Sequence, residues 1–293
     1  MKILFIGSVE YSARTLEFLI KCKSNIVGIC TLQSSKINSD HVDLSVIAKK
    51  FRIPVKYTPN INSKESIEWI SKFNPDIIFC FGWSYLIRSE LLNIPSLGVL
   101  GFHPSPLPRN RGRHPIVWSL ALGLEKTAST FFFMDKYADS GEILSQALID
   151  ISKDDNASTL YEKIIDLSLM QLKDFLPLLE SGQYSTKPQD QSLSNTWRKR
   201  DLFDGQIDWR MSAESIYNLV RALSKPYVGA HFIFKDTNIK VWESSVLKGF
   251  SENIEPGKVV DIGRNGPVIK AGEYALELLD LEPKIELKKG DYL

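Results

Sequence analysis

The residues best suited to chemistry are a histidine and an aspartate that each follow an apolar run. His103 follows the run 97–102, and Asp139 follows the β-prone run 129–134. A carboxylate beside an imidazole fixes the tautomer of the ring and favours its protonated form. The pair therefore predicts a general base, His103, that takes a proton from an attacking group while Asp139 orients it. The alternative is that His103 is a structural residue at a strand end.

The loop after His103 is stiff and cationic. Proline fixes φ and removes a backbone donor, and four prolines occur between residues 102 and 115. The same stretch carries Arg109, Arg111 and Arg113, whose planar guanidinium groups match phosphate oxygens. Each arginine is either a partner for a substrate phosphate or a brace for the loop.

The amino-acid composition limits the classes of protein to which this chain can belong. The chain has 293 residues, is 43% hydrophobic and carries a formal charge of +1, so it gives no global bias towards nucleic acid. No stretch approaches the roughly 20 apolar residues of a membrane span, and the start turns polar at once, so we expect a cytoplasmic protein. Its three cysteines lack metal-site spacing, and we expect no metal.

The elements that must position His103 and Asp139 alternate between strands and helices. Buried strands separated by amphipathic helices indicate an α/β fold with a Rossmann-like, mostly parallel, doubly wound sheet. Ligands collect at the carboxyl edge of such sheets, where both residues are expected. The expected strands are 2–6, 26–32, 53–57, 76–81, 98–103, 129–134 and 143–151, and the expected helices are 12–23, 44–51, 64–73, 115–122 and 158–179.

A second, smaller domain follows the sheet. We predict an N-terminal catalytic domain over residues 1–188, a polar linker over 189–211 and a C-terminal domain over 212–293. Ser212 is the expected N-cap of a helix that ends at Leu223. Five short β-prone runs after that helix suggest a small β-rich domain of the OB type.

The first strand ends in a glycine but lacks a dinucleotide fingerprint. Gly7 and Ser8 follow it, and no G-x-G-x-x-G pattern is present. We therefore expect a tight turn before a helix there, and not an NAD site.

Several motifs together resemble the folate-dependent formyltransferases, which include methionyl-tRNA formyltransferase, the glycinamide ribonucleotide transformylases and the bacterial sugar N-formyltransferases. The resemblance runs along nearly the whole chain. It rests on H-P-S-x-L-P-x-x-R-G at residues 103–112, Pro115-Ile116, the small residues 127–130, Met134-Asp135, Asp139-x-Gly141, Arg198-Lys199-Arg200, the run 204–209 and the segment 221–230.

This resemblance implies a donor, two catalytic residues and a cofactor-binding surface. The formyl donor would be N10-formyltetrahydrofolate, and an acceptor amine would attack the formyl carbon. His103 would deprotonate the amine and Asp139 would support the imidazolium. The pterin ring would lie against the backbone of two loops, formed by Phe81, Gly82, Trp83, Ser84, Tyr85 and Leu86 and by Tyr137, Ala138 and Asp139.

One position departs from the family pattern. The family has an asparagine two residues before the histidine, where this chain has Gly101. Losing one donor to a developing oxyanion typically costs about 100 to 1,000-fold in rate. Asn110 and His114 are the candidate substitutes, and the alternative is that both merely brace the loop.

The acceptor is predicted to be a nucleotide-linked amino sugar, specifically a 4-amino-4,6-dideoxyhexose used in bacterial surface glycans. In the tRNA enzymes a long basic loop follows the second strand, whereas the segment 31–41 here has one lysine and no arginine. Methionyl-tRNA formyltransferase is the rival interpretation. A third is a folate or nucleotide-sugar binding protein that has lost catalysis through Gly101. The resemblance to the bacterial sugar N-formyltransferases, which are often dimers, also implies that this protein forms a homodimer.

Overall fold

The computed structural model describes residues 1–293, which form two compact units that are interleaved in sequence. Unit 1 contains Met1–Gly112, Thr127–Ile149 and Glu162–Trp197, and unit 2 contains Arg113–Lys126, Asp150–Tyr161 and Arg198–Leu293. The sequence had instead predicted consecutive segments with limits after residues 188 and 211. Those limits differ from the limits of the compact units, and the domain boundaries stay a prediction.

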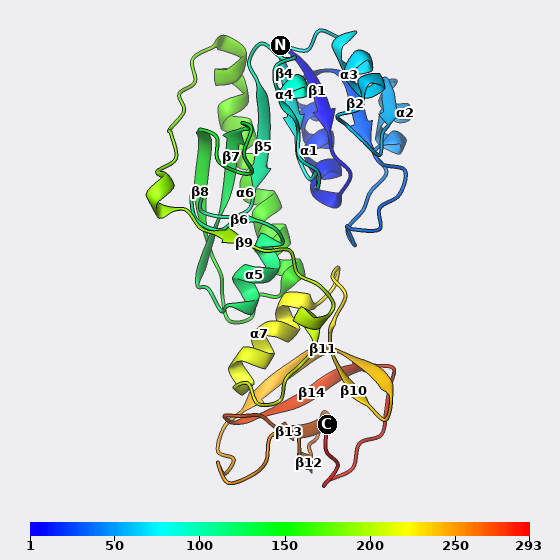
Figure 1. The fold of residues 1–293 in the computed structure, drawn as a ribbon, viewed down its shortest axis with the longest axis vertical. Coiled ribbons are helices and arrows are strands. Elements are labelled where there is room, and N and C mark those ends of the chain that lie inside the picture. The colour runs from blue at the N-terminus through cyan, green and yellow to red at the C-terminus, as the bar shows by residue number, and fades with distance from the viewer. The chain divides into compact units, whose positions relative to one another are not determined.

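Unit 1 is built on a seven-stranded sheet in the order β3-β2-β1-β4-β5-β7-β8 (Figure 1). Parallel pairing joins β3, β2, β1, β4 and β5, whereas β7 is antiparallel to β5. The predicted Rossmann-like, mostly parallel sheet is therefore confirmed. The strands are β1 (Lys2–Ile6), β2 (Asn25–Thr31), β3 (Val55–Tyr57), β4 (Ile77–Cys80), β5 (Val99–His103), β7 (Lys126–Phe133) and β8 (Ile143–Asp150).

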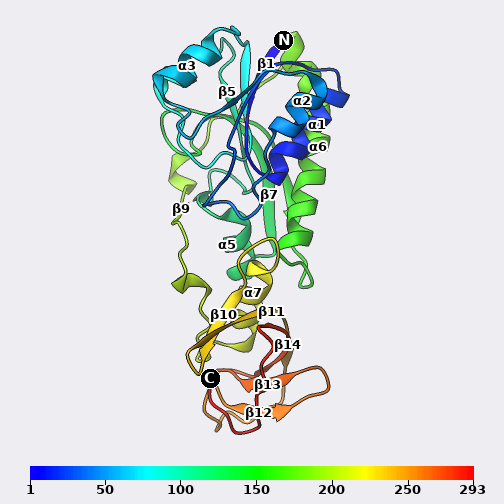
Figure 2. The same cartoon turned by 90° about the vertical axis from the view of Figure 1, so that its right-hand side faces the viewer.

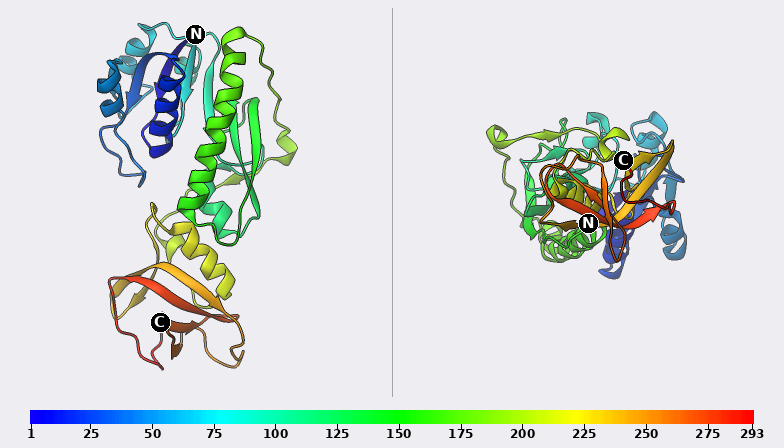
Figure 3. Two further views of the ribbon diagram at one scale, coloured as in Figure 1. Left: turned by 180° about the vertical axis from the view of Figure 1, so that it is seen from behind. Right: turned by 90° about the horizontal axis from the view of Figure 1, so that it is seen from below.

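Helices cover both faces of this sheet. In Figures 2 and 3, α1 and α6 lie on one face and α3 lies on the other. None of the helices is long and apolar enough to cross a membrane. The helices of the sheet region are α1 (Glu10–Lys21), α2 (Ser45–Phe51), α3 (Lys64–Ser71), α4 (Ser89–Leu92) and α6 (Ala157–Ser181).

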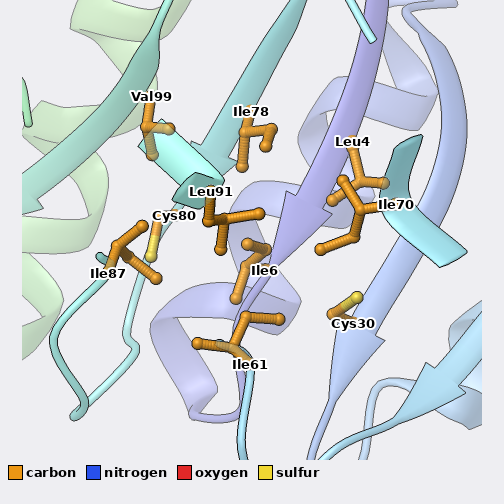
Figure 4. Close-up of a cluster of buried hydrophobic side chains, with 10 residues drawn as sticks. All are labelled: Leu4, Ile6, Cys30, Ile61, Ile70, Ile78, Cys80, Ile87, Leu91 and Val99. Atoms are coloured by element: carbon orange, nitrogen blue, oxygen red, sulfur yellow. The ribbon is translucent and has the colours of Figure 1, made fainter. Parts of the chain in front are cut away.

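The two faces have different cores because alternate strand residues point to opposite sides. Towards α1 and α6 the core is aromatic, and Phe81 and Phe131 contact each other at 5.4 Å between ring centroids. Towards α3 it is aliphatic, as Figure 4 shows. That cluster consists of Leu4, Ile6, Cys30, Ile61, Ile70, Ile78, Cys80, Ile87, Leu91 and Val99.

Unit 2 contains the predicted second sheet. Its five antiparallel strands have the order β10-β11-β14-β13-β12. The Ser212 hydroxyl accepts a hydrogen bond from the Ser215 amide, which confirms Ser212 as the N-cap of α7. The remaining helices and strands are α5 (Pro115–Ala121), α7 (Ala213–Leu223), β10 (Ala230–Phe234), β11 (Thr237–Leu247), β12 (Val259–Ile262), β13 (Pro267–Lys270) and β14 (Ala275–Glu282).

Candidate active site

His103 is the last residue of β5 and is almost completely buried. Its Nε2 lies 2.8 Å from the carbonyl oxygen of Asn110. A carbonyl oxygen only accepts hydrogen bonds, so Nε2 carries the proton and donates it. The Nδ1 atom of the neutral ring therefore keeps its lone pair. The backbone of Asn110 thus fixes the imidazole in the tautomer in which Nδ1 is the base.

Asp139 faces that lone pair from a second loop. Its Oδ2 lies 3.8 Å from His103 Nδ1, which is too long for a hydrogen bond but short enough for a charge to act. The same Oδ2 accepts a hydrogen bond of 2.9 Å from the Gly112 amide. The structure therefore brings together the two residues that the sequence predicted as a catalytic pair. We call residues 103–112 the histidine loop and residues 134–142 the aspartate loop.

Gly101 has no room for the family's asparagine as the side chains now stand. A Cβ at Gly101 would lie 2.7 Å from Met134 Cε and 3.1 Å from Phe132 Cζ. Both distances are shorter than ordinary van der Waals contact. The space beside residue 101 is therefore occupied by a thioether and an aromatic ring, neither of which can polarise a formyl oxygen as an amide does.

The three arginines of the cationic stretch have different environments. Arg111 is 8% exposed, and its guanidinium donates to the side-chain oxygens of Gln189 and Gln191. Of the two interpretations of Arg111, these contacts favour the brace for the loop, and the phosphate contact stays a prediction. Arg109 is exposed, as a phosphate partner must be, and Arg113 is part of unit 2.

His114 belongs to unit 2 and precedes α5 with a left-handed φ of 57°. Its Nε2 is buried and has no hydrogen-bond partner. Burial is the largest cause that lowers the pKa of His114 to about 4, and the charges of Arg113 and Arg200 add to it. His114 is therefore neutral at pH 7. Nearby in unit 2, the Arg200 guanidinium lies 4.6 Å from the centre of the Trp118 ring.

The residues predicted to contact folate divide into buried and exposed members. Phe81 is fully buried in the aromatic core, and its carbonyl accepts a hydrogen bond of 2.6 Å from Ser12 Oγ. The Phe81 side chain is therefore part of the core and its backbone acceptor is occupied, while its place on the folate-binding backbone stays a prediction. Gly82 has φ 69° and is crowded by Val9 and Ser12. Trp83 packs against the aliphatic cluster.

The other predicted folate residues are more accessible. Ser84 is partly exposed and its Oγ donates to Asn38 Oδ1 at 2.9 Å, while Tyr85 and Leu86 are exposed. Tyr137 and Ala138 are also exposed and precede Asp139 in the aspartate loop. The exposed members of the predicted set are thus the ones that a ligand can reach.

A cavity of about 610 Å³ lies in unit 1 beside Tyr85 and Leu86. Ile61 and Ile87 give it an apolar side that is continuous with the cluster in Figure 4. Its lining residues are Pro59, Asn60, Ile61, Asn62, Tyr85, Leu86, Ile87, Arg88, Ser89, Glu90 and Lys136. It therefore combines an apolar wall with two cations and one carboxylate. The structure contains no group of His, Cys, Asp or Glu arranged to hold a metal ion.

Residues 187–197, which we call the strap, were predicted to lie mostly in a linker. The strap instead pairs with both loops of the site. Its short strand β9 (Thr196–Trp197) pairs with β6 (Arg111–Gly112) in the histidine loop, and Lys187 pairs with Ile143 next to the aspartate loop. The sequence of the strap is polar and without periodicity, and it gave no local signal for these pairings, because the hydrogen-bond partners are distant in sequence.

Both halves of the chain match known family models. Residues 1–173 match the model described as formyl transferase, and residues 202–291 match that of the formyl transferase C-terminal domain. The chain belongs to the formyltransferase family. This formyltransferase is 30% identical over 299 residues to the methionyl-tRNA formyltransferase of Staphylococcus epidermidis, covering 100% of this chain and 95% of that protein.

A bifunctional relative shares the same region. The bifunctional polymyxin resistance protein ArnA of Wigglesworthia glossinidia brevipalpis is 34% identical to this formyltransferase over 285 residues, which is 96% of this chain. The matched region spans only 43% of the length of ArnA.

Solved structures share the fold of this formyltransferase. WlaRD, a sugar 3N-formyltransferase crystallised with dTDP and 5-N-formyl-THF, matches with a TM-score of 0.73 at 17% identity, covering 97% of this chain and 99% of that one. The N-formyltransferase of Helicobacter canadensis, in complex with folinic acid and dTDP-3-aminofucose, matches with a TM-score of 0.71 at 16% identity, covering 95% and 99%. The expected formyltransferase fold is thereby confirmed.

Proposed function

We propose that this formyltransferase moves the formyl group of N10-formyltetrahydrofolate to the amine of a nucleotide-linked amino sugar. The observation that carries the proposal is the placement of His103, whose Nε2 lies 2.8 Å from the Asn110 carbonyl and whose Nδ1 lies 3.8 Å from the Asp139 carboxylate, in a chain of this family. A base with its lone pair free and a fixed negative charge beside it suits deprotonation of an attacking amine.

The residues of the site perform the proton transfer. As the amine nitrogen bonds to the formyl carbon, its proton moves to Nδ1 of His103. The imidazolium that forms carries positive charge 3.8 Å from Asp139, whose carboxylate stabilises it. His103 then returns the proton to the leaving nitrogen of tetrahydrofolate. The cosubstrate supplies the activated formyl group.

The accessible surface of unit 1 fits a folate. The cavity beside Tyr85 and Leu86 has an apolar wall that suits an aromatic ring system. Arg88 and Lys136 also line it and can pair with the carboxylates of a glutamate tail. We assign Tyr85 and Leu86 to folate binding on this basis, and Tyr137 and Ala138 because they are exposed in the aspartate loop next to Lys136.

A donor for the formyl oxygen must come from a residue other than Gly101. Asn110 is the better of the two predicted substitutes, because its backbone carbonyl contacts His103 and its side chain carries two N–H donors. His114 is neutral, with its buried Nε2 unpartnered, and belongs to unit 2. We therefore propose Asn110 for this role.

The segment 31–41 supports a sugar acceptor over a tRNA. It folds back on unit 1, where His41 Nδ1 lies 2.8 Å from the carbonyl oxygen of Ser8 and Asn38 accepts from Ser84. Its single cation is the exposed Lys36. A short, closed loop with one cation offers little to a polyanionic acceptor stem. Methionyl-tRNA is the second candidate, because the relatives of that activity are 30% identical over the full chain.

The experiment is an acceptor panel. Tetrahydrofolate release from N10-formyltetrahydrofolate is measured with UDP- and dTDP-linked 3- and 4-amino sugars and with charged initiator tRNA. We expect turnover with a 4-amino-4,6-dideoxyhexose nucleotide and none with tRNA. Turnover with tRNA alone would replace the sugar proposal, and folate binding without turnover on any amine would indicate a binding protein.

A further inference from the structure

Gln189 of the strap bridges the two loops of the site with one side-chain amide. Its Oε1 accepts from Arg111 Nη2 at 2.6 Å and from Nε at 3.2 Å. Its Nε2 donates to the carbonyl oxygens of Asp139 at 3.0 Å and Gly141 at 2.7 Å. Gln189 is 8% exposed. The oxygen of this amide therefore accepts from two N–H groups of Arg111, and its nitrogen donates to two backbone carbonyls of the aspartate loop.

This bridge closes a ring of contacts that runs from Asp139 through Gln189 and Arg111 to Gly112 and back to the Asp139 carboxylate. Arg111 lies between Asn110, whose carbonyl holds His103, and Gly112, whose amide holds the Asp139 carboxylate. Gln189 joins the Arg111 side chain to the Asp139 backbone. Asp139 is consequently held at both its carboxylate and its carbonyl group, each time by a group connected to the histidine loop.

The aspartate loop needs such support because its backbone is strained. Asp139 has φ 54°, in the left-handed region that costs a non-glycine residue about 1–2 kcal/mol. At Gly141 a Cβ would lie only 1.8 Å from the Phe133 carbonyl oxygen, so the turn is as tight as the chain allows. Gln189 supplies the donors for the carbonyls of both residues.

The chemistry of the bridge requires a neutral amide. A carboxylate at position 189 would still accept from Arg111, but it would place negative oxygens against the carbonyls of Asp139 and Gly141. A lysine would oppose the buried charge of Arg111. Of the side chains of this length, only an amide presents an acceptor and two donors at once.

We propose that Gln189 is a positioning residue for proton transfer, which keeps the Asp139 carboxylate against His103 Nδ1 by tying the aspartate loop to the histidine loop. The proposal rests on the proposed function for the roles of His103 and Asp139. It adds that formyl transfer depends on a residue of the strap that touches neither substrate nor reacting atoms.

The decisive variant is Gln189→Glu, because it keeps the acceptor for Arg111 and removes both donors to the aspartate loop. We expect kcat to fall 10 to 100-fold, while KM for the acceptor stays within threefold and the melting temperature changes little. We also expect faster hydrogen exchange at the Gly112 amide in the substrate-free protein, since its acceptor on Asp139 becomes mobile.

Two control variants separate the alternatives. Gln183→Glu adds the same charge at an exposed site before the strap and should leave kcat and exchange unchanged. Gln191→Glu alters the other partner of Arg111 and removes the hydrogen bond from Gln191 Nε2 to the Gln189 carbonyl oxygen. It keeps both Gln189 donors to the aspartate loop, and should lower kcat by less than threefold.

Each outcome decides the proposal. Normal kcat and normal Gly112 exchange in Gln189→Glu would overturn it, as would a lower melting temperature with normal kcat. If the unmodified protein transfers formyl to no amine, the proposed function fails. The exchange at Gly112 then still decides whether Gln189 holds Asp139.

Discussion

Two histidines of one proline- and arginine-rich stretch have opposite environments. His103 donates from Nε2 to a carbonyl and presents Nδ1 to a carboxylate 3.8 Å away. His114 has a buried Nε2 without a partner and cationic neighbours that, together with burial, lower its pKa to about 4. The same side chain thus faces a carboxylate in unit 1 and cations in unit 2.

The two rings show that the groups next to a histidine decide whether it can act as a base. Its residue type and its position in a proline- and arginine-rich stretch do not decide this. A carbonyl at one nitrogen and a carboxylate near the other make a base that can accept and hold a proton. Burial, together with surrounding cations, keeps the His114 ring neutral, so protonating this ring in acid costs stability. The following predictions test that contrast, beginning with the largest expected effect.

Removal of either member of the catalytic pair should abolish formyl transfer. We expect His103→Ala and Asp139→Ala each to lower kcat/KM by about 1,000-fold or more, with the circular dichroism spectrum unchanged. The double variant should be scarcely slower than either single one, because the two residues act as a unit. A near-normal rate in either single variant would remove that residue from the mechanism.

Protonation of His114 should destabilise the folded protein in acid. Its pKa is about 6.5 when unfolded and about 4 when folded, so the unfolded state binds more protons between these values. Stability from this group is complete above pH 6.5 and is lost as the pH falls towards 4. We expect about 2 kcal/mol of loss between pH 7 and 4.5, after allowance for solvent screening.

The matched variant for this pH effect is His114→Gln, measured by denaturant unfolding at each pH. It should flatten the pH dependence over that range while leaving kcat within a few-fold. An unchanged pH slope would show that His114 titrates normally, and the contrast with His103 would then disappear.

Restoration of the family asparagine should destabilise the site. Gly101→Asn places a Cβ against Met134 and Phe132, and overpacking of this kind costs about 1–2 kcal/mol. The additional change Met134→Ala should recover most of that loss, because it frees the space. Thermal unfolding measures both effects, and a Gly101→Asn variant of full stability would show that the pocket adapts.

The smallest effect is expected at the exposed arginine of the histidine loop. Arg109→Ala should raise KM for a phosphate-bearing acceptor about fivefold, an effect of about 1 kcal/mol that shrinks with added salt, and leave kcat unchanged. The matched control is Lys36→Ala in the segment 31–41, which should change nothing with a sugar nucleotide. A larger effect of Lys36→Ala than of Arg109→Ala would favour the tRNA acceptor.

Much of the fold could be predicted from the sequence because it depends on local patterns. The alternation of apolar runs and amphipathic segments predicted the sheet and its helices, although α1 begins at Glu10 and not at residue 12. The strand β9 was missed, because its pairing with Arg111 and Gly112 leaves no local trace. The C-terminal strands and the cap at Ser212 also followed from local signals.

The sequence by itself determined which groups can do chemistry. His103 directly follows one apolar run and Asp139 lies in the loop after another, and the motifs around them identify the family. Only the tertiary structure decided how those groups work: the Asn110 carbonyl selects the tautomer, Met134 fills the space beside Gly101, and Gln189 ties Asp139 in place. The physical reason is that hydrogen bonds and steric contacts depend on distances in space, and segments distant in sequence supply most of these partners.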